Sequence, residues 1–143
     1  MEKVTIYEIP KCKVVCSEYG MFGDGKLEAF NAWFSKIDRP IFPNDYLYFD
    51  SKKELFRWIY IYSEGLETEG FEVEDFEGGL YAVVAGIDNT DTTEVFDTIY
   101  AYLKEKELIV DESRYYLGNI PTTEAGFKAL GYNQMNYFVP IIK

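Results

Sequence analysis

Histidine is absent from this chain of 143 residues. Its absence excludes the Ser-His-Asp and Cys-His arrangements of nucleophilic catalysis, together with every metal site that contains a histidine. Any catalysis would have to use carboxylates, Tyr or Lys. We therefore expect neither a metal nor a cofactor.

Cysteine is scarce, because the chain has only Cys12 and Cys16. Both lie in KCKVVCSEY, which has the pattern of a β-strand. Residues four apart on a strand share a face but lie about 13 Å apart, which is too far for a disulfide. Two thiols without His or a second Cys pair make no zinc site. The pattern predicts two buried thiols in a reducing compartment.

Long apolar runs are also missing. The segment MEKVTIYEIP at the amino terminus lacks the apolar stretch of a signal peptide, and no window approaches the length of a transmembrane helix. These absences predict a cytoplasmic protein.

Basic residues are few, with 14 Lys and Arg against 25 Asp and Glu and a net charge of −11. A protein that binds duplex DNA must neutralise phosphates with Lys and Arg, so we expect no direct contact with nucleic acid or with an anionic membrane. An acidic surface would favour a cationic ligand. The alternative is that the acidic surface only keeps the protein soluble.

Apolar residues make up 48% of the chain and aromatic residues 18%, with 13 Tyr and 11 Phe. The length suits one globular domain with a real core. An aromatic-lined pocket and a Tyr-rich sheet both account for so many rings.

Alternation and helical spacing predict eight strands and two amphipathic helices. The helices cover residues 26–37 and a segment around Val95–Leu103. The strands are Val4–Ile9, Lys13–Tyr19, Asp45–Asp50, Leu55–Tyr62, Phe71–Phe76, Leu80–Ile87, Tyr115–Ile120 and Met135–Ile142. The acidic stretch between Glu64 and Glu77 is expected to be a solvated loop and strand edge, with cation binding as the alternative.

The second half of the sequence repeats the first, since Phe30 aligns with Ile99 and Trp33 with Tyr102. We predict one α+β domain, a tandem duplication of a strand–helix–strand–strand unit over about 1–68 and 69–143. Its antiparallel sheets would carry two helices on one side and a ligand cleft between the repeats.

Alternation along residues 55–62 places Trp58 and Tyr60 on one side, and Ile59 and Ile61 on the other. The aliphatic side suits the helix, so we expect the rings on an open face that binds ligand. Cation–π contacts on such a face would suit flat or cationic ligands, whereas the same rings would also suit a homodimer interface. The predicted ligand-binding residues are Tyr48, Trp58, Tyr60, Tyr81 and Tyr116.

Three segments carry a family resemblance: TIYEIPKCKVVCSEYG (5–20), FEGGLYAVVAG (76–86) and LGYNQMNYFVPIIK (130–143). Together they resemble the GyrI-like effector-binding domains of bacterial transcription regulators. The resemblance implies a duplicated fold with a cleft that binds small molecules. In multidrug-responsive members, rings and a buried Glu contact lipophilic cations. Because the match begins at the amino terminus, we expect a stand-alone binder.

One segment departs from the family. Its regulators usually place the ligand-binding Glu on the strand after the second helix, and SRYYLGNIP (113–121) contains no carboxylate. A neutral aromatic ligand is therefore an alternative to a cationic one. The resemblance implies two further functions, a hydrolase of electrophilic cyclopropane-containing compounds and a protein-interaction inhibitor. The first would use carboxylate and Tyr side chains.

Overall fold

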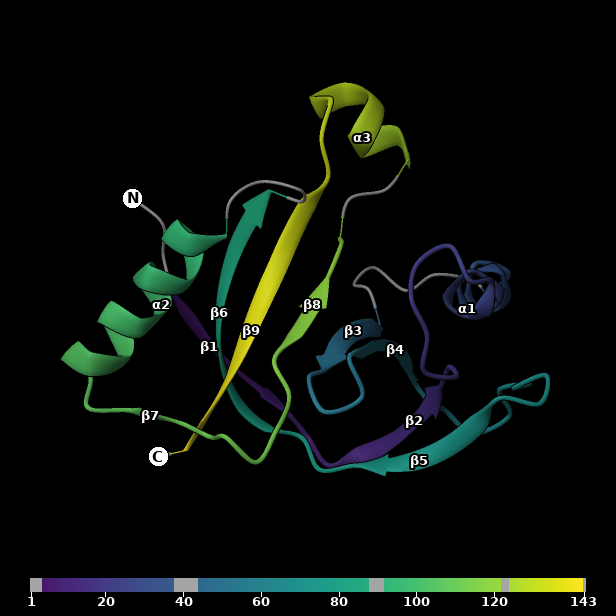
Figure 1. Cartoon of the computed structure of the whole chain (residues 1–143), viewed down its shortest axis with the longest axis horizontal. Helices are drawn as coiled ribbons and strands as arrows, with labels where there is room; N and C mark the ends of the chain where they lie inside the picture. Colours follow the sequence, from purple (N-terminus) through teal and green to yellow (C-terminus); the bar gives the residue numbers. More distant parts are fainter. Residues whose placement is uncertain (1–3, 38–43, 88–91, 122–123, 143) are drawn as a thin grey trace. The chain divides into compact units, whose positions relative to one another are not determined.

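A computed structural model describes residues 4–37, 44–87, 92–121 and 124–142 (Figure 1). The chain divides into two compact units. One is Pro10–Gly78, and the other combines Met1–Ile9 with Gly79–Lys143. We call them the Arg57 unit and the Arg114 unit, after an arginine that each contains.

The Arg57 unit is a four-stranded antiparallel sheet with one helix. The strands lie in the order β3-β4-β2-β5. Along the chain its elements are β2 (Cys12–Cys16), α1 (Lys26–Phe34), β3 (Asp45–Asp50), β4 (Leu55–Ile61) and β5 (Glu72–Phe76).

The Arg114 unit has the strand order β1-β6-β9-β8, with β7 also paired to β9. Every pairing is antiparallel. Its elements are β1 (Thr5–Ile9), β6 (Gly79–Ile87), α2 (Thr93–Glu105), β7 (Ile109–Val110), β8 (Leu117–Asn119), α3 (Glu124–Leu130) and β9 (Gln134–Ile142).

The predicted α+β class with antiparallel sheets is confirmed, and each predicted strand and helix is present with ends shifted by a few residues. The sequence patterns missed β7 and α3. A strand of two residues is too short to alternate, and α3 has seven residues with Gly126 among them, which weakens a helical pattern. The tandem duplication, its boundary and the cleft between repeats stay predictions.

The start of α1 is fixed by two carboxylates. Asp24 accepts a hydrogen bond from the backbone N–H of Lys26 at 2.9 Å, and Glu28 accepts one from the N–H of Gly25 at 3.0 Å. These bonds satisfy backbone donors that the first turn of a helix leaves unpaired, where the helix dipole also favours negative charge. Gly25 has φ +93°, a conformation that glycine adopts without strain. The side chain of Lys26 is positioned as a result.

The aromatic side of β4 faces the helix, so the predicted assignment of faces is wrong. The ring of Tyr60 lies 5.7 Å from that of Trp33 and 5.8 Å from that of Phe34, and Trp58 lies 5.1 Å from Phe34. Tyr60 is buried in this cluster. Rings bury more apolar area against the aromatic face of α1 than the aliphatic side chains would, which is the physical reason for the reversal.

Strand register places Tyr48 on one face of the sheet and Trp58 and Tyr60 on the other, although all three were expected on one face. Tyr48 of β3 is directly opposite Arg57 of β4, and Leu47 is opposite Trp58. Because paired residues share a face, Tyr48 lies with Arg57 on the side that α1 does not cover. Trp58 and Tyr60 lie on the other side.

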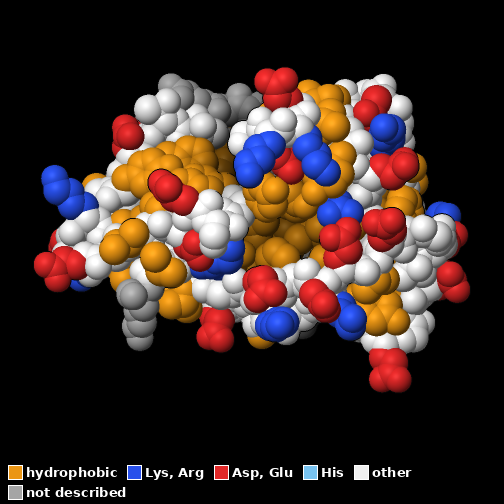
Figure 2. Space-filling view, turned by 60° about the horizontal axis from the view of Figure 1, so that its bottom comes forward, with side chains coloured by type: hydrophobic (Ala, Val, Ile, Leu, Met, Phe, Trp, Pro, Cys, Tyr) orange, Lys and Arg blue, Asp and Glu red, His pale blue; other side chains and the backbone are white. Residues whose placement is uncertain are grey.

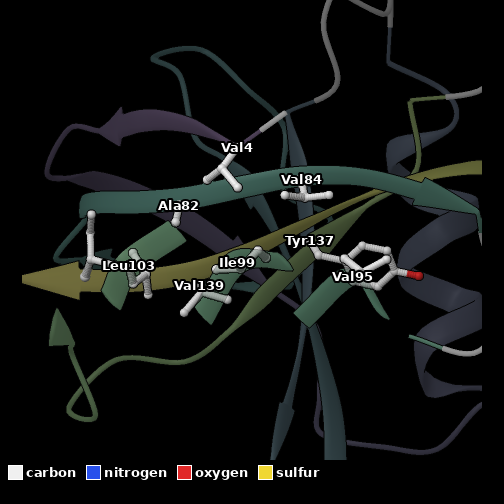
Figure 3. Packing of buried hydrophobic residues seen from close by; sticks show 9 residues of the cluster. Val4, Ala82, Val84, Val95, Ile99, Leu103, Tyr137 and Val139 are labelled. Carbon is white, nitrogen blue, oxygen red and sulfur yellow. The ribbon is translucent and has the colours of Figure 1, made fainter. Parts of the chain in front are cut away.

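The core of the Arg114 unit is aliphatic except for Tyr137. In Figure 3, Ala82 and Val84 of β6, Val139 of β9, and Ile99 of α2 point toward one another. Figure 1 shows α2 running alongside this sheet, in contact with β6. The alternate residues of β6 and β9 therefore occupy the face that α2 does not cover.

We predict that Tyr60→Ala lowers the free energy of unfolding by about 3–5 kcal/mol, because it empties a ring-sized volume in a close-packed cluster. Denaturant unfolding followed by circular dichroism measures the loss. Tyr7→Ala is the matched control, since Tyr7 is 51% exposed, and it should cost less than about 1 kcal/mol. Equal, small losses in the two variants would contradict the assignment of Tyr60 to the core.

Candidate ligand-binding pocket

The uncovered face of the Arg57 unit is organised around one buried charge. The Arg57 side chain is 10% exposed, and its Nη2 lies 2.5 Å from Oε2 of Glu74 and 3.9 Å from Oε2 of Glu72. Its Nε donates to the backbone oxygen of Ser17 at 3.1 Å. A buried charge is tolerated only when it is paired and hydrogen-bonded, and these contacts satisfy both conditions.

A tyrosine ring lies beside this charge. The guanidinium of Arg57 sits 4.6 Å from the centre of the Tyr19 ring, and Lys53 Nζ sits 3.8 Å from it. The Tyr19 hydroxyl is 3.3 Å from that of Tyr48 and 3.5 Å from Nη1 of Arg57. The cations and hydroxyls hold Tyr19 in place by cation–π attraction and hydrogen bonding.

The protonation states follow from these contacts. Burial opposes the charge of Arg57, but hydrogen bonds to Glu74 and Tyr48 outweigh it and raise the arginine pKa above its usual value. Burial raises the pKa of Tyr48, and its hydrogen bond with Tyr19 adds to the effect. At neutral pH the cluster therefore holds a charged arginine and a neutral Tyr48.

A pocket of about 620 Å³ opens beside this cluster. Its volume lies in the range of small-molecule sites. The lining comes from the end of β2 and the loop after it, the start of α1, Arg57 of β4 and the loop that enters β5. The lining residues are Cys16, Ser17, Glu18, Tyr19, Lys26, Arg57, Glu69, Gly70, Phe71 and Glu72.

The pocket combines aromatic surface with an excess of carboxylates. Tyr19 and Phe71 supply rings, whereas Glu18, Glu69 and Glu72 outnumber Lys26 and Arg57. The charge of Arg57 is further offset by its ion pair with Glu74 at the edge of the site. The resulting field favours a cation over an anion.

The thiol of Cys16 is protonated at neutral pH and therefore unreactive. Burial raises its pKa to about 11; Arg57 opposes the shift, and Glu74 and Glu72 reinforce it. Cys12 also has a raised pKa, again through burial. Both cysteines are free thiols; Cys16 is buried as predicted, whereas Cys12 is only half-buried. Neither is a thiolate nucleophile at neutral pH.

The uncovered face of the Arg114 unit has an arginine of its own. Arg114 donates to the backbone oxygens of Leu80 at 3.0 Å and Ile141 at 2.8 Å, so it joins β6 to β9. Its guanidinium lies 4.8 Å from the centre of the Tyr81 ring. Nε of Arg114 also contacts Asp111 at 2.8 Å. One side of the Tyr81 ring is thus occupied by a cation of the chain itself.

The structure divides the five predicted ligand-binding residues. Tyr48 joins the Arg57 cluster, and Tyr81 lies buried on the face that α2 does not cover. Trp58 and Tyr60 lie on the helix side of their sheet. Tyr116 was expected on an open sheet face but contacts α2, where its hydroxyl is 2.8 Å from that of Tyr100. Ligand contact by each of the five stays a prediction.

Sequence reasoning missed the residues that form the pocket, above all Arg57, Tyr19 and Phe71. Arg57 lies in the strand predicted over residues 55–62 but is absent from the predicted ligand-binding residues. A single cation inside a strand of apolar and aromatic residues was the available signal, because such a charge needs a partner when it is buried.

The wider surface is acidic without one dominant centre. Figure 2 shows red carboxylate side chains spread over the visible face, interspersed with blue basic ones and orange apolar areas. Within the described ranges, no group of three or more Cys, Asp or Glu is placed to hold a metal ion. None of the described helices has the length and apolar character needed to cross a membrane.

No protein-family model and no curated protein matches the sequence. Solved structures do match. A hydrolase from Listeria innocua has a TM-score of 0.70 at 10% identity over 98% of this chain and 92% of that one. The EcmrR C-terminal domain has a TM-score of 0.65 at 9% identity, over 100% of this chain and 99% of that one. SAV2435 bound to tetraphenylphosphonium has a TM-score of 0.56 at 9% identity, over 98% of this chain and 94% of that one.

These identities establish likeness of fold alone. The last two structures have GyrI-like folds. The α+β fold of this chain is consistent with the fold that its sequence resembles.

We predict that Cys16 reacts with a thiol reagent roughly two orders of magnitude more slowly near pH 8 than a free cysteine does, because almost none of it is thiolate there. The rate should rise about tenfold per pH unit until the pH approaches its pKa of about 11. The measurement uses Cys12→Ala, so that one thiol reports. The same variant unfolded in urea is the control, and equal rates in the two states would contradict the burial of Cys16.

Proposed function

We propose that the protein is a stand-alone GyrI-like domain that binds a small aromatic or lipophilic cationic molecule without transforming it. The observation that carries the proposal is the Arg57 pocket, where two rings and three carboxylates surround a volume of about 620 Å³. Rings supply apolar area and cation–π attraction, and the carboxylates supply complementary charge.

The neighbouring structures support this proposal. SAV2435 has been solved with tetraphenylphosphonium, a lipophilic cation of the kind that the pocket suits. The C-terminal domain of EcmrR has a similar fold. The similar fold is the reason to propose small-molecule binding for this chain. The residues of the pocket indicate the kind of ligand.

Binding without turnover is favoured by the state of the reactive groups. Cys16 is protonated at neutral pH, Tyr48 has a raised pKa, and Arg57 is committed to an ion pair. A nucleophile or general base needs the opposite, namely a pKa near the operating pH. Hydrolysis remains the second candidate because a neighbouring structure is a hydrolase. Release of product from an electrophilic cyclopropane-containing compound would favour hydrolysis over binding.

We predict saturable binding of tetraphenylphosphonium, measured by tryptophan fluorescence. Trp33 is a suitable reporter because its ring lies 5.6 Å from that of Phe71, which lines the pocket. Glu72→Gln should weaken binding of the cation about two- to fivefold, the effect of removing one charge that is largely exposed to water. It should leave binding of a neutral aromatic compound such as naphthalene unchanged.

Glu77→Gln is the matched control, since it removes the same charge from a residue that does not line the pocket. A loss of cation affinity in both variants would attribute binding to net charge and contradict the pocket. So would a folded protein that binds neither tetraphenylphosphonium nor naphthalene.

A further inference from the structure

Strand β5 forms an open edge of the Arg57 unit. It pairs with β2 and, within the described ranges, with no other strand (Figure 1). Four of its five residues are exposed, and Val73 is an apolar side chain that is 39% exposed. An open edge presents backbone N–H and C=O groups to which another extended chain can add as a strand.

Hydrogen bonds on the other side of β2 show how its backbone is oriented. The N–H of Tyr62 donates to the backbone oxygen of Lys13 at 2.9 Å, and the N–H of Ser17 donates to that of Trp58 at 2.9 Å. The odd-numbered residues along β2 therefore direct their backbone groups toward β4. Because these directions alternate along a strand, the even-numbered residues of β2 bond to β5.

The register then identifies the backbone groups of β5 that point outward. The even-numbered residues of β2 are paired with Glu72, Glu74 and Phe76, which therefore bond to β2. Val73 and Asp75 lie between them and direct their N–H and C=O groups away from the sheet. No residue that the structure describes is hydrogen-bonded to these four groups. They are the docking points of the edge.

The edge is also strongly acidic. Residues 64–77 contain seven carboxylates and no Lys or Arg. The basic side chains of other elements within 4.0 Å of these carboxylates are Lys11, Lys13, Lys36 and Arg57. Negative charge is thus in excess, and the side chains of Glu72, Asp75 and Glu77 are 69–79% exposed. The field at the edge attracts positive charge.

This charge decides which chain can occupy the edge. A second copy that paired antiparallel through the same strand would place Glu74 opposite Glu74. Like charges that are directly opposite destabilise a sheet, and charged side chains commonly protect open edges in this way. An extended segment with Lys or Arg at the facing positions meets attraction instead of repulsion.

We propose that the β5 edge binds a basic peptide segment that adds to the sheet as an antiparallel strand. Segment residues opposite Val73 and Asp75 exchange backbone hydrogen bonds with them. Basic side chains lie opposite the three carboxylates of β5, and apolar ones lie opposite Val73 and Phe76. In antiparallel register this pattern reads Leu-Lys-Lys-Val-Lys, with the leucine opposite Phe76.

The first test compares two peptides on the unmodified protein by isothermal titration calorimetry. One is acetyl-Thr-Leu-Lys-Lys-Val-Lys-Thr-amide, and the other is the same peptide N-methylated at its valine. Methylation keeps the charge but removes the N–H that would donate to the carbonyl of Val73. We expect the unmethylated peptide to bind at least about tenfold more tightly, with an affinity that falls as salt is added. Equal affinities would reduce binding to charge attraction and overturn the proposal, as would no binding at millimolar concentration.

The second test locates the bound peptide by amide hydrogen exchange, followed by NMR. Binding should slow exchange of the Val73 and Asp75 amides, which point outward in the free protein. The Glu74 amide is the internal reference, because it is already bonded to β2 and should change less. Protection of other strands without protection of Val73 and Asp75 would contradict the edge as the binding surface.

The third test removes an outward donor from the protein. Val73→Pro should weaken the unmethylated peptide about tenfold, because proline lacks the N–H. Proline is tolerated on an edge strand where the N–H faces solvent, so the pairing with β2 should remain. Val73→Ala is the matched control; it keeps the N–H and should cost less than about threefold. Equal losses in the two variants would contradict the proposed backbone bonds.

Circular dichroism shows whether Val73→Pro is folded, and if it is not, the two peptides on the unmodified protein decide. Val73 does not line the Arg57 pocket. Folded Val73→Pro should therefore bind tetraphenylphosphonium as the unmodified protein does. Loss of peptide binding and loss of cation binding are thus separate results, and either proposal fails without the other.

Discussion

The buried charge of Arg57 is the constraint on which the candidate pocket depends. A guanidinium removed from water must find counter-charge and acceptors, and Glu74, Tyr48 and the backbone of Ser17 supply them. Meeting that demand fixes the end of β2, the rotamer of Tyr19 and the position of β5 together. The pocket lies where these parts meet. Its shape is therefore a consequence of solvating one charge inside the protein.

The two units use arginine in different ways. Arg57 pairs with carboxylates of β5, whereas Arg114 donates mainly to backbone oxygens of β6 and β9. Each lies over a tyrosine ring. Tyr81 has one side of its ring occupied in this way and is buried, so its contribution to ligand binding would come from shaping the apolar face. The Arg57 pocket adds the ring of Phe71 and is lined by more carboxylates than basic groups, which makes it the better receptor for a cation.

Much of the fold follows from sequence, because alternation and helical spacing are local properties. They located β3 without error and placed α1 and α2 correctly. The side of a strand that faces a helix is set by register and packing between segments, which one sequence does not encode locally. Tyr60 was therefore placed on the wrong side, and the pairing of Tyr48 with Arg57 was not foreseen. The pocket is formed by two loops and an ion pair, and sequence spacing indicates none of them.

A crystal structure of the protein with tetraphenylphosphonium tests the central claim most directly. The account predicts the cation against the rings of Tyr19 and Phe71, with the Glu72 carboxylate as its nearest counter-charge and the ion pair between Arg57 and Glu74 intact. Two results would contradict it. One is a structure with the phosphonium bound away from these rings, and the other is a structure in which Arg57 has left Glu74 and points into solvent.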